Sequence, residues 1–288
     1  MIKKVASLLF YRWFLALMLL VILVIEMYML LSVDGLLALH FLDVGQGDSC
    51  LIKTPGNKLV LVDAGEDESV LRELGETIPF WRNRVDMLVG THADSDHIKG
   101  FVYVLENFDV GMVLINDLSV FDTSLDRIKE IAESNEIPIM EIEQGDNINI
   151  GELSIDVLWP PSEELDIFDD NQKSIVIQGE YSKFSFLLTG DIEIEQEERL
   201  ISEKHINKVN ILKLSHHGSR TATSSIFLDE IGPDAAIISC GLDNKFSHPN
   251  LEVIQALESK GITYYRTDQH GRISFKTDGI RYKKIVEK

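Results

Sequence analysis

Four potential metal ligands crowd into six residues of this chain, directly after an apolar run. The run covers residues 85–90 and has the composition of a strand, and the ligands are His92, Asp94, Asp96 and His97. Imidazoles and carboxylates gathered at a strand end are costly unless a cation neutralises and orders them. Histidine and aspartate are the usual ligands of zinc and of manganese-like ions. The cluster therefore predicts a metal site at the end of a strand.

Three further segments have the same order of strand, sharp turn and polar cluster. Their polar ends are Asp63-Ala64-Gly65, Thr189-Gly190-Asp191 and Ser215-His216-His217-Gly218-Ser219. Sheet-based enzymes gather polar groups at strand ends to build their sites. Each turn is common alone, but the four segments together indicate one site assembled from several strands.

Strands and helices alternate along residues 37–288, without a linker rich in proline, glycine or serine. We therefore expect one catalytic domain of mixed α/β type over this range. Among its elements we expect a helix over 67–80, a helix beginning near His97, and a strand over 147–158. Cys50 and Cys240 lie in apolar, strand-like surroundings, where buried free thiols are expected.

Residues 1–36 form a separate segment. Residues 13–33 carry no charge except Glu26, and as a helix they would span a bilayer core of about 30 Å. Basic side chains precede them, which orients the N-terminus to the cytoplasm. We predict a single-pass anchor in the cell membrane, with the domain on the extracytoplasmic side. The alternatives are a secretory signal peptide, which would give a secreted protein, and a buried core helix.

The charge of the domain constrains its substrates. The chain carries −20, and because residues 1–36 hold three basic and two acidic side chains, residues 37–288 carry −21. Such a domain lacks the broad basic face with which many proteins bind nucleic acid. The charge counts against DNA as a substrate without excluding it.

The order of these motifs resembles that of the metallo-β-lactamase superfamily. Within it, the chain is most similar to the soluble hydrolase domain of ComEC-type competence proteins, which take part in DNA uptake. The likeness runs from about Leu39 to the C-terminus. It is carried by residues 41–49, 62–65, 92–97, 171–174, 188–191, 215–219, 244–249 and 267–271. It implies an αββα four-layer sandwich over residues 37–288 and a metal-dependent hydrolase.

The resemblance also implies two metal sites that share a bridging carboxylate, Asp191. The residues it assigns to the first site are His92, Asp94 and Asp191, and to the second Asp96, His97, Asp191 and His216. His217 is the alternative to His216 as a ligand, with the other histidine then lying behind it.

The first site departs from the pattern of the superfamily in two ways. Asp94 stands where the superfamily usually has histidine, and the ComEC-like branch also carries aspartate there. No histidine lies between His97 and Asp191. Asn171 and Ser174 are the candidates for the equivalent region. An oxygen-rich site favours manganese or weakly held zinc. We expect one or two divalent ions, Zn or Mn.

Three residues are candidates for catalysis. Asp96 belongs to the ligand cluster, His248 could donate a proton to a leaving oxygen or hold a phosphate, and Lys245 could pair with a phosphate. A purely structural role is the alternative for His248. Asp63 either orients a ligand histidine or caps its own turn. The glycine-rich turn over 45–48 gives the backbone a close approach to the site.

We predict a membrane-anchored, metal-dependent hydrolase that cleaves a phosphodiester with a metal-activated water. The resemblance implies nuclease activity, with DNA as the partner. With one predicted membrane span, however, this chain lacks the multi-pass channel domain expected of a full uptake protein. Hydrolysis of a cell-surface phosphodiester, in a wall polymer or a lipid headgroup, is the alternative, and β-lactam hydrolysis is a weaker third. A non-catalytic binding protein that retains the fold is the alternative from a different class.

Overall fold

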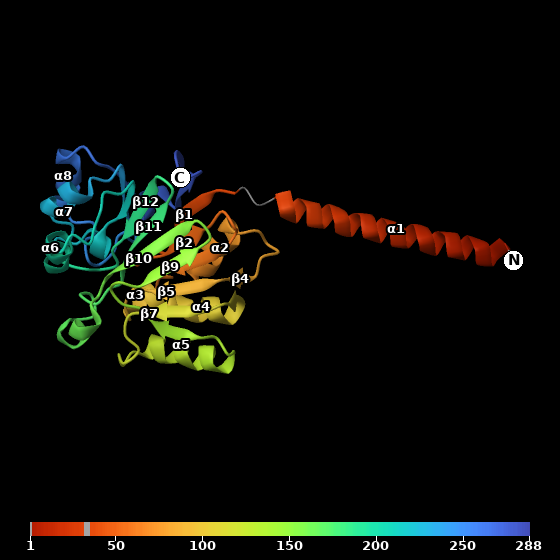
Figure 1. Ribbon diagram of the computed structural model, residues 1–288, viewed down its shortest axis with the longest axis horizontal. Helices are drawn as coiled ribbons and strands as arrows, with labels where there is room; N and C mark the ends of the chain where they lie inside the picture. The colour runs from red at the N-terminus through yellow and green to blue at the C-terminus, as the bar shows by residue number, and fades with distance from the viewer. Residues whose placement is uncertain (1, 32–34) are drawn as a thin grey trace.

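Two β-sheets face each other at the centre of the molecule (Figure 1). The computed structural model describes residues 2–31 and 35–288. The first sheet has the strand order β17 (Tyr282–Val286), β16 (Ile273–Thr277), β1 (Leu37–Phe41), β2 (Cys50–Lys53), β3 (Leu59–Val62), β5 (Met87–Gly90), β7 (Val113–Ile115) and β8 (Ile139–Glu141). The second has the order β15 (Thr263–Arg266), β14 (Ala235–Ile238), β13 (Ile211–Lys213), β12 (Phe184–Leu188), β11 (Val176–Tyr181), β10 (Leu153–Trp159) and β9 (Asn147–Ile150). A small pair joins β4 (Arg84–Val85) to β6 (Asp109–Val110).

Helices cover the outer face of each sheet (Figure 1). Those beside the first sheet are α2 (Ser69–Thr77), α3 (Ser95–Ile98), α4 (Gly100–Asn107) and α5 (Thr123–Ser134). Those beside the second sheet are α6 (Ile194–Ser202), α7 (Ser225–Ile231) and α8 (Leu251–Ser259). Shorter elements are α9 (Thr267–His270) and the 3₁₀ turns η1 (Ser162–Ile167) and η2 (Ser215–Gly218).

Three hydrophobic cores account for the layers. The central core lies between the sheets, where Phe41 of β1 and Phe186 of β12 are both fully buried. A second core packs α2, α4 and α5 on the first sheet, and a third packs α6, α7 and α8 on the second. An interface on both faces of each sheet explains why β1 and β3 are buried throughout rather than at every second residue. The αββα four-layer sandwich over the domain is thus confirmed.

The carboxyl ends of two strand pairs position the site. β3 and β5 are parallel neighbours in the first sheet, and β12 and β13 are parallel neighbours in the second. Parallel neighbours end at the same edge of a sheet, so the segments that follow them lie close together. Each of these four strands is followed by one of the polar clusters that the sequence singled out.

Local elements differ from the sequence prediction in their bounds. The helix expected over 67–80 is α2, Ser69–Thr77, and the helix expected from His97 is divided into α3 and α4. The strand expected over 147–158 is a hairpin of β9 and β10, turned at Gly151 with φ +64°. Glycine adopts this left-handed conformation without a Cβ penalty. Cys50 and Cys240 are buried and free, as predicted.

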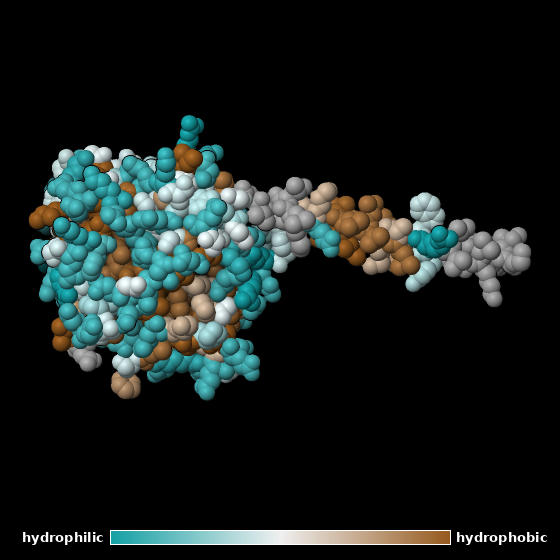
Figure 2. Space-filling view, viewed as in Figure 1, coloured by the Kyte–Doolittle hydropathy of each residue, from teal (hydrophilic) through white to brown (hydrophobic). Residues whose placement is uncertain are grey.

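The helix expected at the N-terminus is present as α1 (Ile2–Leu31) and lies apart from the sheets (Figure 1). Its side chains from Trp13 to Met27 are exposed and mostly apolar (Figure 2). Within the described residues, however, no helix combines the length and the apolarity needed to cross a membrane. The predicted span over 13–33 is therefore not supported, and its residues 32 and 33 lie outside the described residues.

Candidate metal centre

Ligands from both sheets meet at the edge of the central core. The short helix α3 after β5 supplies Asp96 and His97, the turn after β12 supplies Asp191, and η2 after β13 supplies His217. Nε2 of His97 and Nε2 of His217 each lie 3.4 Å from Oδ2 of Asp191. Nε2 of His217 also lies 3.4 Å from Oδ2 of Asp96. The four residues therefore surround one small volume.

These separations fit a shared cation. A tetrahedral ion with bonds of about 2.1 Å holds its ligand atoms about 3.4 Å apart. Within the described residues, Nε2 of His97, Nε2 of His217 and Oδ1 of Asp191 are buried and make no hydrogen bond. Buried polar groups left in this way are unfavourable without a partner. The donor set and its spacing therefore fit a divalent metal.

The first predicted site is formed in part. His92 is fully buried and is grouped with His97 and Asp191 closely enough to share an ion. Oδ2 of Asp94 lies 3.5 Å from Nε2 of His92, but the Asp94 side chain is 45% exposed. Among the described residues, Asp94 does not belong to any group of ligand side chains close enough together to hold one ion. Asp94 therefore borders this site rather than closing it.

Ser174 and Asn171 take different places around His92. The Ser174 hydroxyl lies 3.2 Å from Nδ1 of His92 and accepts a hydrogen bond from the Asp191 amide at 3.0 Å. Asn171 instead lines the open cavity above the cluster. Ser174 thus orients two ligands from behind, and Asn171 faces the space where a substrate would bind.

The geometry separates the two neighbouring histidines. Both have left-handed backbones, with φ +48° for His216 and +54° for His217, so their rings point in different directions. The ring of His217 is buried among the ligands, whereas Nε2 of His216 is 3.9 Å from Asp191 and its side chain is 23% exposed. Among the described residues, His217 belongs to groups of side chains close enough together to hold one metal ion, and His216 does not. The geometry favours His217 as the ligand that the sequence left open.

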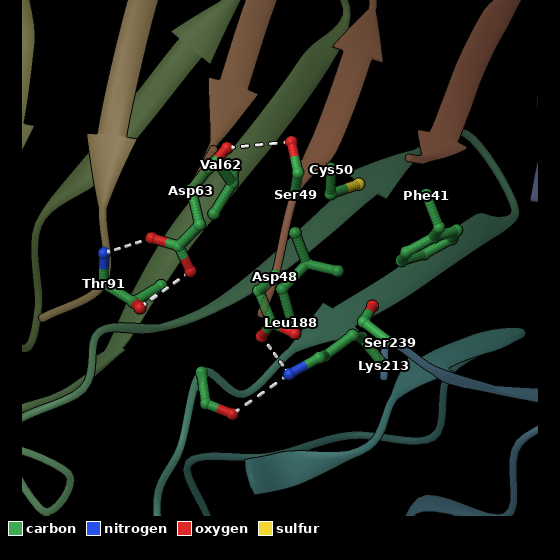
Figure 3. A pocket seen from close by; sticks show the side chains of 11 residues that line it. Phe41, Asp48, Ser49, Cys50, Val62, Asp63, Thr91, Leu188, Lys213 and Ser239 are labelled. Carbon is green, nitrogen blue, oxygen red and sulfur yellow. Dashed lines mark hydrogen bonds and ion pairs between the residues drawn. The ribbon is translucent and has the colours of Figure 1, made fainter. Parts of the chain in front are cut away.

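Asp63 fixes the orientation of His97. Its Oδ2 lies 2.8 Å from Nδ1 of His97. Both of its oxygens accept hydrogen bonds from Thr91 at 2.8 Å (Figure 3). A carboxylate on Nδ1 holds the proton there and leaves Nε2 to face the metal. Asp63 has φ +54°, a conformation that costs an aspartate little compared with bulkier residues. Of its two predicted roles, orientation of a ligand is the one that the contacts support.

The Ser239 carbonyl oxygen and the carboxylate of Asp48 together face Nδ1 of His217, and the sequence did not predict this. Nδ1 of His217 lies 3.2 Å from Oδ1 of Asp48 and 3.0 Å from the Ser239 carbonyl oxygen. Lys213 forms a buried ion pair with Asp48 and donates to the Gly190 carbonyl oxygen at 3.4 Å (Figure 3). The only sequence signal for this pair is a lysine in the otherwise apolar run 211–214.

The carboxylates shift the proton affinities of the buried ligands. Burial alone would lower the pKa of His97 and His217, but Asp191 with Asp63 or Asp48 outweighs burial and holds both well above the usual value. Burial would raise the pKa of Asp191, yet the two imidazoles hold it well below its usual value. In the absence of metal, the cluster is therefore a network of carboxylates and protonated imidazoles.

An open cavity gives access to the cluster. It has a volume of about 240 Å³, and the residues that line it are Gln46, Asp94, Asp96, Asn171, Asp191, His216, His217, Phe246 and His248. Burial and the neighbouring histidines lower the pKa of His248 to about 4. The predicted catalytic residue His248 is thus at the cavity in a neutral form. Lys245 lines an adjoining cavity rather than this one.

Comparison with known families identifies the domain. Residues 42–242 match the family model of the metallo-beta-lactamase superfamily. The chain belongs to this superfamily. The metallo-β-lactamase fold implies binding of divalent metal, in agreement with the ligand groups around Asp191.

Curated relatives of this metallo-β-lactamase chain have names linked to competence, which confirms the predicted resemblance. The chain is 33% identical over 276 residues to "ComE operon protein 3" of Bacillus subtilis, covering 90% of this chain and 34% of the relative. It is 31% identical to "Competence protein ComA" of Neisseria gonorrhoeae, covering 81% of this chain and 31% of the relative. The chain thus spans about a third of the length of these relatives.

Solved structures share the fold at low sequence identity. The metallo-beta-lactamase fold protein YhfI from Bacillus subtilis has a TM-score of 0.59 and 13% identity, covering 84% of this chain and 99% of that one. A structure described as a new diphosphatase from the PhnP family has a TM-score of 0.50 and 17% identity, covering 84% and 98%. These similarities support the αββα architecture of the domain.

We predict that the two neighbouring histidines differ in metal binding. Replacing the buried ligand in His217→Ala should weaken manganese or zinc binding by more than the ~10- to 100-fold that loss of an orienting partner costs. His216→Ala should retain binding within a few-fold, because its ring lies outside the cluster. Titration calorimetry of the two variants measures the difference. Equal losses, or a larger loss in His216→Ala, would contradict the assignment.

We also predict that metal binding releases protons. Because the raised pKa values keep His97 and His217 protonated at neutral pH without metal, an ion must displace the proton on each Nε2, while each Nδ1 keeps its own. Release of about two protons is expected, and the affinity should rise between pH 6 and pH 8 as proton competition falls. Calorimetry in buffers of different ionisation enthalpy counts the protons; a binding heat independent of the buffer would contradict the prediction.

Proposed function

We propose that this chain is a metal-dependent phosphodiesterase with nuclease activity. The observation that carries the proposal is the cluster of ligand residues that lines an open cavity, with His248 in the same lining. A competence protein among its relatives adds support for nucleic acid as the substrate class. A phosphate in this cavity would have the ligand carboxylates and His248 among its neighbours.

The charge of the cluster supports two divalent ions in the proposed enzyme. Five carboxylates gather around the three imidazoles. Among the described residues, Lys213 is the one lysine that pairs with them, which leaves four negative charges. Two divalent ions would neutralise these four charges. When bound, such ions supply a Lewis acid for the phosphoryl group and an activated water.

The residues of the chain divide the remaining work. Asp63 and Asp48 keep the ligand imidazoles oriented toward the metal side. His248, neutral near pH 7 because its pKa is lowered to about 4, suits a hydrogen bond to a phosphoryl oxygen better than donation of a proton. Its predicted role in holding a phosphate is the one that we retain.

A cell-surface phosphodiester is the second candidate substrate. Residues 37–288 carry −21, and no broad basic face is expected on such a domain. A glycerol-phosphate wall polymer or a lipid headgroup presents only a short charged segment to the cavity. The same cluster would cleave such a bond with the same residues.

The activity test measures metal-dependent hydrolysis by the purified chain. Bis-p-nitrophenyl phosphate, single-stranded DNA and a glycerol-phosphate polymer would each be assayed with manganese and with zinc. Asp191→Ala should reduce turnover at least ~10²-fold, because several kcal/mol of charge stabilisation depend on the metal. His205→Ala, which changes a histidine outside the ligand cluster, serves as the matched control and should keep full activity.

The outcomes separate the proposals. Faster turnover of DNA supports the nuclease, and faster turnover of the polymer supports the surface phosphodiesterase. Bound metal without turnover of any of the three substrates would favour a binding protein that retains the fold. Turnover that survives in Asp191→Ala would overturn the assignment of the site.

We further propose that α1 attaches the chain to the cell membrane, with the domain outside the cytoplasm. The exposed apolar side chains between Trp13 and Met27 support attachment to a membrane. The chain should remain with membranes after a carbonate wash, and protease added to intact cells should digest the domain. A variant lacking residues 1–36 is the control. Release of the full chain by the wash would argue against attachment.

A further inference from the structure

One exposed aromatic ring stands at the opening of the proposed active site. Phe246 is 51% exposed and lines the cavity over the metal ligands. It also lines an adjoining cavity of about 380 Å³, together with Gln46, Glu66, Ser95, Asp96, Asn244 and Lys245. The two cavities share Gln46, Asp96 and Phe246. The ring therefore lies where a group attached to a phosphate in the cluster would pass.

Two neighbouring side chains contact the ring of Phe246. Phe246 stacks on the imidazole of His248, with ring centroids 5.7 Å apart and an interplanar angle of 23°. Lys245 places its Nζ 4.8 Å from the centroid of the same ring. Since lysine is a flexible side chain, its ammonium can move from the ring to a neighbouring phosphate without disturbing the backbone.

The loop that carries Phe246 is pinned to the ligand loops. Nδ2 of Asn244 donates to the carbonyl oxygens of Gly241 at 2.9 Å and of His248 at 2.6 Å, so this side chain closes the loop from within. The Asn250 amide donates to the Gly218 carbonyl oxygen at 2.8 Å, which ties the loop to η2. An exposed ring fixed in this way loses little freedom when it binds a ligand.

We propose that Phe246 is a stacking platform for an unpaired nucleobase next to the scissile phosphate. The platform selects single-stranded nucleic acid as the substrate of the proposed phosphodiesterase, on which this inference rests. Every base offers a flat π-face to an aromatic side chain, whereas the faces of bases in a duplex are covered by their neighbours. A polyol-phosphate polymer has no such face.

Stacking also reconciles nucleic acid with an acidic domain. The two cavities are lined by the carboxylates of Glu66, Asp94, Asp96 and Asp191 and by one lysine, Lys245. Binding through many phosphate contacts would weaken steeply with salt. Binding through metal and one stacked base should depend on salt only weakly.

The test compares two strands of equal length, oligothymidylate and a fully abasic strand, as substrates of the full chain with manganese. The wild type should prefer the strand with bases. Phe246→Ala should raise KM for oligothymidylate ~10- to 100-fold and leave the abasic strand unchanged, while Phe246→Trp should restore the preference. Leu242→Ala, which removes another exposed apolar side chain from the same loop, is the control and should behave as the wild type.

Three results would overturn the platform: no preference for bases in the wild type, an equal effect of Phe246→Ala on both strands, or an equal effect of Leu242→Ala. If the wild type cleaves neither strand, the proposed function fails. Binding of the same labelled strands, measured by fluorescence anisotropy, then tests the stacking role of Phe246 independently of cleavage. Tighter binding of oligothymidylate that Phe246→Ala abolishes would support it. Equal binding of both strands would reject it.

Discussion

The buried carboxylate of Asp191 is the group on which the rest of the site depends. It is 3% exposed, and an isolated carboxylate at that depth would be strongly unfavourable. His97 reaches it from the first sheet and His217 from the second, each at 3.4 Å. Each imidazole also contacts an aspartate of its own, Asp63 for His97 and Asp48 for His217. The charge of Asp191 is thus coupled through the imidazoles to both of these carboxylates. The site is therefore one electrostatic unit, not a row of independent ligands.

Much of this arrangement could be predicted because its signals are local. An apolar run followed by a polar turn marks a strand that ends at the site, and this held for the segments before Asp63, His92, Asp191 and Ser215. The order of the layers has no local signal in the sequence. The alternation of strands and helices indicates only a mixed α/β domain, and the family resemblance was needed to predict four layers. The choice between His216 and His217 was beyond a sequence argument, because it depends on left-handed backbone geometry and on Asp48 from the other sheet.

The supporting residues were the hardest to predict, because their partners are far away in the chain. Lys213 meets Asp48, and Ser174 meets both His92 and Asp191. No spacing rule connects such residues, since the contacts exist only after the two sheets have packed. The hairpin of β9 and β10 was missed for a different reason: its turn is only two residues long, and a continuous run of strand-forming residues conceals it.

The division of the ligands between the two sheets has a mechanical consequence. A bound ion would be a cross-link between the halves of the sandwich, since His92 and His97 belong to one half and Asp191 and His217 to the other. An ion that binds only the folded chain adds stability in proportion to the logarithm of its concentration, about 2.7 kcal/mol at 100 times Kd. The free energy of unfolding of the domain would then follow the concentration of divalent metal around it, so that removal of the ion would lower the stability of the sandwich as well as the activity.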